Sequence, residues 1–239
     1  MTVLYSVREG VATITLNRPE NRNALNLAMC QGLIESANAA ARDASIRILF
    51  VRANGPAFCA GADLKERQGM REAEVRERRM KGFAAYAALE ALPMPVVAVV
   101  AGPAVGSGCE IACACDFIVA TPAASFRTPE ALRGTVGATQ RLPRVLGKRL
   151  AKDLMFTGRT LSAEEARDAG LVSRLVLDVD LEKTLEEIRQ TIFNSPSNAL
   201  RLAKRCIDRG VELDPRGALD AEIAAIDEQL AAGSWMGKA

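Results

Sequence analysis

The sequence predicts an α/β protein with an all-helical C-terminal region. Strand-like and helix-like runs alternate along the first three quarters of the chain, whereas apolar residues at helical spacing dominate the remainder. Hydrophobic residues make up 49% and charged residues 25% of the 239 residues, the balance of an ordinary globular protein. We therefore divide the chain into a core, residues 1–180, and a helical region, residues 181–239.

The first third of the chain predicts a β-hairpin, a helix and a strand. Residues 3–7 and 11–17 are rich in strand-forming residues and are separated by a Glu9-Gly10 turn. Asn26 begins a helix with apolar residues at helical spacing, and residues 46–51 form the next strand.

The middle third continues the alternation. Residues 58–63 are a loop of small residues, 64–91 a highly charged helix, and 96–101 a buried strand. A Gly/Pro-rich loop at 102–108 leads into a short helix, and another strand follows at 116–120.

Helix caps and apolar stripes define the last third. Ser162 and Glu165 fit a capping box, and Ser195-Pro196 and Asp214-Pro215 each predict an N-cap followed by proline at the first helical position. Two stripes share spacings of 4, 3 and 4 residues, which predicts two amphipathic helices. These stripes are Leu181, Leu185, Ile188 and Ile192, and Leu219, Ile223, Ile226 and Leu230.

The composition excludes several functions. The chain has no histidine, so Ser-His-Asp catalysis and His-containing zinc sites are impossible, and acid-base chemistry falls to other side chains. Cysteines 109, 113 and 115 lack a paired zinc spacing, so we expect packing and no metal. With no signal region and no apolar run of membrane-spanning length, we expect a cytoplasmic protein without membrane contact.

Nucleic-acid binding is disfavoured by the near-balance of charge. The chain has 31 basic and 29 acidic residues and only ten aromatic ones. Residues 65–81 hold seven basic and four acidic side chains. They are read as an exposed charged helix, with binding of RNA or an acidic ligand as the alternative.

Glu110 is the first candidate for chemistry. It is the only carboxylate between Glu90 and Asp116, and no basic residue is within reach along its own helix, so we expect burial to raise its pKa. A structural reading competes, because Ser107 and Glu110 also fit a capping box.

Three other features allow two readings each. The turn at 106–108 could present backbone N–H groups to an oxyanion or, less plausibly, cradle a nucleotide. The loop at 58–63 could lend further N–H groups to the same anion or could be a tight connection. The turn at 106–108 lacks the third glycine of a dinucleotide fingerprint. Glu130 follows Pro129, and could be catalytic or an ordinary first-turn glutamate.

Taken together, these motifs resemble the enoyl-CoA hydratase/isomerase (crotonase) superfamily over about residues 3–230. Asn17-Arg-Pro-Glu-Asn-Arg-Asn-Ala-Leu-Asn26 is similar to its N-terminal signature, and Phe58-Cys-Ala-Gly-Ala-Asp-Leu-Lys65 to its first oxyanion and coenzyme-A loop. Gly106-Ser-Gly-Cys-Glu110 resembles the second oxyanion turn, and 126–130 carries the second glutamate. Residues 139–143, 156–158 and 166–172 continue the match.

The resemblance implies a spiral of ββα units, followed by C-terminal helices that mediate assembly into a homotrimer or homohexamer. It implies catalysis by Glu110 and Glu130 and an oxyanion hole made by the backbone N–H groups of Ala60 and Ser107. Coenzyme A enters as part of the substrate, with no covalently bound cofactor. The implied substrate-binding positions are Arg22, Ala24, Ala60, Gly61, Ala62, Asp63, Leu64 and Lys65.

Three departures from the family pattern concern the substrate. Ser107 stands where most relatives have glycine, and the loop at 133–139 is about three residues shorter than usual. The chain ends at 235–239, before the tail that helps cover coenzyme A in relatives.

The expected function is hydration of a 2-enoyl-CoA to a 3-hydroxyacyl-CoA, a lyase reaction of fatty acid metabolism. Alternatives on the same fold are a Δ3-Δ2 enoyl-CoA isomerase and a CoA-thioester hydrolase or lyase. The alternative of a different class is an RNA-binding member, because Ala60-Gly-Ala-Asp-Leu-Lys-Glu-Arg67 also resembles the RNA-associated 3-methylglutaconyl-CoA hydratase.

Overall fold

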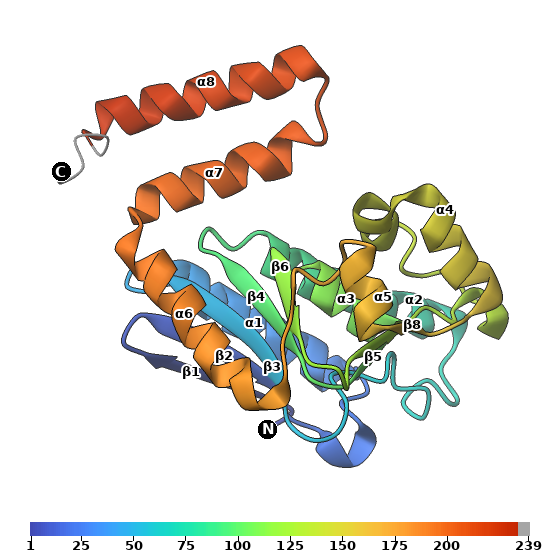
Figure 1. Cartoon of the computed structure of the whole chain (residues 1–239). Coiled ribbons are helices and arrows are strands. Elements are labelled where there is room, and N and C mark those ends of the chain that lie inside the picture. The colour runs from blue at the N-terminus through green and yellow to red at the C-terminus, as the bar shows by residue number, and fades with distance from the viewer. Residues whose placement is uncertain (234–239) are drawn as a thin grey trace.

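Six strands form the main sheet of the protein in a computed structural model that describes residues 1–233. β1 (Val3–Arg8) and β2 (Val11–Leu16) form the predicted hairpin, and the other neighbouring strands pair in parallel. The order is β1-β2-β3-β4-β6-β9 (Figure 1). The remaining strands are β3 (Ile48–Ala53), β4 (Val96–Val100), β6 (Phe117–Ala120) and β9 (Arg174–Leu175).

Helices cover both faces of this sheet, so its central strands are apolar on both sides. Alternate residues of β3 and β4 point to opposite faces. One face packs in the same cluster as α1 (Leu27–Arg42) and α2 (Glu72–Glu90), and the other packs against α6 (Leu181–Asn194). The predicted stripe of α6 is confirmed, because all four of its apolar residues are buried there.

A second, smaller sheet positions the site. β5 (Pro103–Val105) pairs in parallel with β7 (Ser125–Arg127), which pairs antiparallel with β8 (Leu161–Ser162). β5 lies inside the segment predicted as a Gly/Pro-rich loop, because three residues are too few to leave a strand pattern. β5 is followed at once by Gly106 and α3 (Ser107–Cys113), so the sheet holds the start of that helix.

The charged helix is shorter than the predicted range of 64–91. α2 begins at Glu72, and the residues before it form turns. The Asp63 carboxylate accepts hydrogen bonds from two backbone N–H groups that follow it, and Gly69 has a φ of +80°. The positive φ of Gly69 is incompatible with a continuous helix, because α-helical residues need negative φ.

The predicted caps are confirmed with one exception. Asn26, Ser162 and Asp214 each accept the expected hydrogen bonds at the start of α1, α5 (Ala163–Asp168) and α8 (Pro215–Ala231). Ser195 does not cap α7 (Ser197–Gly210), whose N-cap is Pro196. The Ser195 hydroxyl donates instead to the Thr191 carbonyl, which closes the end of α6.

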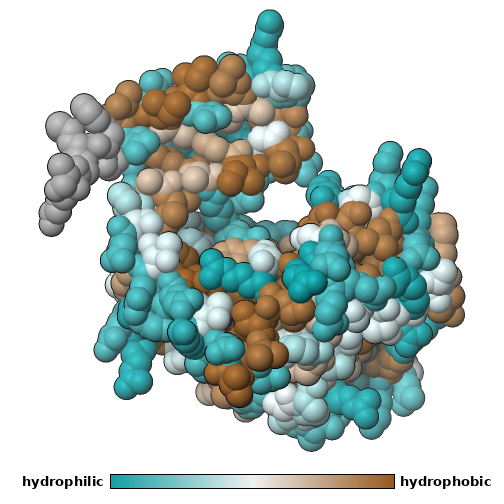
Figure 2. Space-filling model, in the orientation of Figure 1, coloured by the Kyte–Doolittle hydropathy of each residue, from teal (hydrophilic) through white to brown (hydrophobic). Residues whose placement is uncertain are grey.

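α7 and α8 form a helical arm that stands off from the α/β body (Figure 1). The apolar stripe of α8 is exposed, and apolar residues are visible along both arm helices (Figure 2). Residues 235–239, where the sequence departs from the family's usual tail, lie outside the described residues. Within residues 1–233 no helix has both the length and the apolar character to cross a membrane.

Candidate active site

Glu110 lies on α3, at the end of the body that α4 (Arg141–Thr157) covers, and is only 6% exposed. The N-cap of α3 is Gly106, and no side chain caps the helix, so the capping box with Ser107 does not form. Glu110 Oε2 accepts a hydrogen bond of 2.9 Å from Arg141. The side chain is therefore directed out of its own helix, which excludes the capping role.

No basic residue reaches Glu110 along α3, as the sequence predicted, but Glu110 has a basic partner on another helix. Arg141 is 31 residues away along the chain and approaches from α4, so a search along α3 alone could not find it. Arg141 also donates two hydrogen bonds of 2.6 Å to the Glu90 carboxylate, and its guanidinium carbon lies 5.4 Å from the centre of the Tyr86 ring. Glu110 is thus one end of a polar network that spans three helices.

The expected direction of the Glu110 pKa is confirmed. Burial raises the pKa, Arg141 opposes that effect through charge and a hydrogen bond, and the charge of Glu90 raises it further. The result is a pKa above the ordinary value for a glutamate. A carboxylate of raised pKa is a stronger base than an exposed one, which suits general base chemistry.

Glu130 precedes the short helical turn η2 (Ala131–Arg133) and faces the same region. Its Oε2 atom is buried without a hydrogen-bond partner within residues 1–233. Burial raises its pKa, and the charge of Glu110 adds to the rise. A Cβ at Gly106, which has a φ of +52°, would collide with Glu130 Oε1, so this approach requires glycine.

Glu110 and Glu130 line one cavity of about 80 Å³. Ser107 and Tyr86 contribute to its wall, which makes it narrow. A larger cavity of about 620 Å³ adjoins it and shares Ala62 and Glu130 with it. The two glutamates therefore lie in a small cavity that adjoins a larger one.

Among the backbone N–H groups near this boundary, those of Ala62 and Ser107 have no acceptor within residues 1–233. The N–H of Ala60 is already used, because it donates to the Arg22 carbonyl at 3.0 Å. A Cβ on Gly61 would lie 3.0 Å from the Val105 carbonyl oxygen, so glycine lets the two turns approach each other. Ser107 thus fits the expected oxyanion donor, whereas the expectation for Ala60 is corrected: its N–H is used, and the N–H of Ala62 in the same loop is free within residues 1–233.

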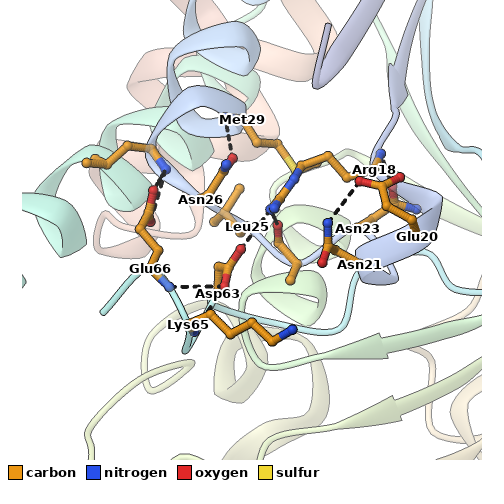
Figure 3. A network of polar contacts seen from close by, with 12 residues as sticks. Arg18, Glu20, Asn21, Asn23, Leu25, Asn26, Met29, Asp63, Lys65 and Glu66 are labelled. Carbon is orange, nitrogen blue, oxygen red and sulfur yellow. Dashed lines mark hydrogen bonds and ion pairs between the residues drawn. The ribbon is translucent and has the colours of Figure 1, made fainter. Parts of the chain in front are cut away.

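The other predicted ligand positions divide into an anchor and an exposed group. Asp63 is buried and forms an ion pair of 2.9 Å with Arg18 (Figure 3). Burial pushes the pKa of Asp63 upward, but Arg18 and two backbone N–H groups outweigh it and hold the pKa below its ordinary value. Asp63 therefore anchors the loop, while Arg22, Leu64 and Lys65 are exposed and accessible to a ligand.

Sequence reasoning gave no role to several residues that shape the site. Asn23 is fully buried, and its amide donates to the carbonyls of Asn54 and Ala57. These hydrogen bonds join the N-terminal signature to the loop that follows β3. Arg18, which lies in the same signature, holds Asp63 and the Ala24 carbonyl. Such residues could have been suspected from the density of Asn and Arg at 17–26, but their partners lie far away in sequence.

The family of this chain follows from comparison with known proteins. The model of the enoyl-CoA hydratase/isomerase family matches residues 6–233. The chain belongs to this family. It is 38% identical over 233 residues to the enoyl-CoA isomerase/hydratase fer4 of Mycosarcoma maydis, with 92% of this chain and 85% of that protein covered. It is 41% identical over 216 residues to human enoyl-CoA hydratase domain-containing protein 2, mitochondrial, with 86% and 73% covered.

Solved structures confirm the crotonase-like fold. The enoyl-CoA hydratase of Bacillus anthracis superposes with a TM-score of 0.91 at 37% identity, covering 95% of this chain and 90% of that one. The enoyl-CoA hydratase of Mycobacterium smegmatis gives 0.92 at 32% identity, with 96% and 91% covered. The likeness therefore extends over nearly the whole of this chain.

Proposed function

We propose that this family member is an enoyl-CoA hydratase, a lyase that adds water across the double bond of a 2-enoyl-CoA. One observation carries the proposal: the carboxyl groups of Glu110 and Glu130 line one cavity beside the free N–H groups of Ala62 and Ser107. Addition of water to an enoyl thioester builds negative charge on the thioester oxygen. Two fixed N–H donors stabilise such charge as it develops.

The two carboxyl groups have different surroundings, which suits different tasks. Glu110 has the Arg141 guanidinium beside it, so its ionised form is supported. Glu130 has no ion pair within residues 1–233, so its protonated form is favoured by burial. We assign Glu110 as the base that deprotonates water for attack at C3, and Glu130 as the acid that protonates C2. Transfer of the proton from Glu110 to Glu130 then restores the starting state.

Coenzyme A would bind along the larger cavity. Ala60, Gly61, Ala62 and Leu64 line this cavity. The exposed Lys65 follows Leu64, and the exposed Arg22 accepts a hydrogen bond from Ala60 at its carbonyl, so both offer positive charge next to these residues. Cationic side chains suit the phosphates of coenzyme A. No other cofactor takes part in the proposed reaction.

The proposal is tested by following the loss of enoyl-thioester absorbance with crotonyl-CoA and with a longer 2-enoyl-CoA. We expect hydration of at least one substrate and its loss in Glu110→Gln. Conversion of a 3-enoyl-CoA without hydration would show an isomerase instead, and release of free thiol would show a hydrolase. Tight binding of RNA that fades with salt, without turnover, would favour the RNA-binding alternative.

The charge distribution gives RNA binding little support. Arg78, inside the basic stretch, is buried and forms an ion pair of 2.7 Å with Glu66. Arg71 pairs with Glu74 on the surface. Part of the positive charge of residues 65–81 is thus neutralised within the chain.

We further propose that the helical arm assembles the chain into a homotrimer or homohexamer. The apolar stripe of α8 is exposed, and a groove of about 670 Å³ lies between α7 and α8. A second copy of the chain would remove this apolar surface from water. Light scattering coupled to size-exclusion chromatography should give a multiple of three chains.

A further inference from the structure

The guanidinium group of Arg141 is shared between two carboxylates of unequal exposure. It donates two hydrogen bonds of 2.6 Å to Glu90, whose side chain is 42% exposed, and one of 2.9 Å to Glu110, whose side chain is 7% exposed. The Tyr86 ring lies beneath the guanidinium carbon. Arg141 is therefore held from three sides, in a position that reaches only one oxygen of Glu110.

The other oxygen of Glu110 is left for a ligand. Within residues 1–233 no hydrogen bond reaches Oε1, and this atom is not among the buried polar atoms that lack a partner. Glu110 lines both the small cavity that contains Glu130 and an open groove of about 530 Å³ that contains Glu90 and Arg141. The polar network thus occupies one side of Glu110, and the reaction site lies on the other.

We propose that Arg141 and Glu90 act as a pair of positioning residues that orient Glu110 and set the balance between its charged and neutral forms. The inference rests on the proposed function, because it assigns Glu110 the role of base. Neither Arg141 nor Glu90 is proposed to touch the substrate. Their effect passes through the Glu110 carboxylate.

The sharing of Arg141 between Glu90 and Glu110 affects how readily the Glu110 carboxylate accepts a proton. An arginine paired with Glu110 alone would favour the carboxylate strongly and leave it a weak base. A buried Glu110 with no cation would hold its proton and be unable to accept one from water. Glu90 takes part of the positive charge of Arg141, so Glu110 stays between these limits.

Other titratable groups lie near this network. Glu130 lines the small cavity together with Glu110. The positive charges of Arg133 and Arg79 lower the pKa of Glu130, against the effect of burial. Burial raises the pKa of Cys113 on α3 to about 12 and also raises the pKa of Tyr86 on α2, so both are neutral near pH 7. The remaining charged groups that line either cavity are Arg67, Arg78 with its partner Glu66, and Arg144 with its partner Glu212.

Two variants should move the pH dependence in opposite directions. Loss of the cation in Arg141→Gln should move the acid limb of the kcat profile to higher pH and lower kcat about 10²-fold, because Glu110 is also released from its position. Loss of the competing anion in Glu90→Gln should move the acid limb to lower pH, with less than about tenfold loss of kcat. Arg141→Lys should recover part of the rate, since it keeps the charge but loses the fork of donors.

Arg144→Gln is the matched control. Arg144 lies about one helical turn after Arg141 on α4 and lines the same groove. It forms an ion pair with Glu212, which has no proposed part in catalysis. It should leave both the rate and the acid limb unchanged. Opposite shifts in Arg141→Gln and Glu90→Gln support the proposal, and acid limbs that stay in place, or move together, overturn it.

A measurement without turnover separates this inference from the proposed function. The Glu110 carboxyl can be titrated by 13C NMR in protein labelled at glutamate side chains, with Glu110→Gln used to assign the signal. The titration midpoint should rise in Arg141→Gln and fall in Glu90→Gln even if no enoyl-CoA is hydrated. An unchanged midpoint in both variants would overturn the inference while leaving the proposed function standing.

Discussion

α6 and α8 carry apolar stripes of the same spacing, and the structure treats them in opposite ways. Leu181, Leu185, Ile188 and Ile192 of α6 are 3–8% exposed against the main sheet. Leu219, Ile223, Ile226 and Leu230 of α8 are 47–56% exposed on the arm. The same pattern therefore predicts a helix in both places, but in neither place does it predict the surface against which the apolar stripe packs.

The difference separates the functions of the two regions. The body buries its apolar surface within one chain, and this rigid packing holds the charged groups of the site at fixed positions. The arm leaves apolar surface uncovered, which suits contact with another chain. We expect chemistry to depend on the body and assembly to depend on the arm.

The largest expected effect is the loss of chemistry in the body. Glu130→Gln should lower the rate of hydration by about 10²- to 10⁴-fold, because the variant cannot donate the proton to C2. Glu222→Gln makes the same change on the arm and should leave the rate unchanged. Steady-state assays on both variants test this, and full activity in Glu130→Gln would mean that the shortened loop after it has removed Glu130 from the reaction.

A second pair of variants compares the two stripes directly. Ile188→Ala in α6 should lower the free energy of unfolding by about 2–5 kcal/mol, because the side chain is buried within one chain. Ile226→Ala occupies the same place in the stripe of α8, and its loss should be smaller and should depend on protein concentration. Urea denaturation at several concentrations tests this. Equal losses that do not depend on concentration would contradict the separation of body and arm.

A charge on the arm should affect assembly. Ile226→Glu should shift the mass in solution toward that of a single chain, since an unpaired carboxylate would be buried in the contact. Helix content by circular dichroism should stay unchanged because the side chain is exposed in the isolated chain. Wild-type protein that is already a single chain at working concentrations would show that the arm has another use.

The smallest expected effect concerns the stability of the body. Burial raises the pKa of Glu130 above the ordinary glutamate value of 4.5, so the folded state binds this proton more tightly than the unfolded state does. The associated stability is present at low pH and is lost as the pH rises through the folded-state pKa. Glu130→Gln has no titrating group at this position, so the variant does not lose this stability as the pH rises. Its free energy of unfolding relative to wild type should therefore increase with pH above 4.5, by under about 1 kcal/mol. Thermal melts at several pH values would show a constant difference if the prediction were wrong.

The elements of the fold were largely predictable because their signals are local. The hairpin, the helix after Asn26, the buried strands and two of the three later caps all depend on residues within about one helical turn or one strand. β5 was missed because it is a strand only through its pairing with β7. The start of α2 was predicted too early, because this charged segment has no apolar periodicity from which the turn at Gly69 could be recognised.

The two candidate glutamates of the site were found from the sequence, but their surroundings were not. The two glutamates carry recognisable motifs, and the structure brings them to one cavity. The partner of Glu110 was not predicted, since Arg141 reaches it from another helix. The choice between Ala60 and Ala62 was also not predictable, because it depends on which N–H already bonds the Arg22 carbonyl.

The sequence by itself determined the family, the order of helices and strands, and the two glutamates as candidates for chemistry. Only the tertiary structure decided that Glu110 shares Arg141 with Glu90, that Ser107 and Ala62 have free N–H groups, and that one of two like stripes is buried. The physical reason is distance along the chain. Helix and strand signals act between near neighbours, whereas the contacts of Arg141 join residues 31 and 51 positions apart and exist only once the helices have packed.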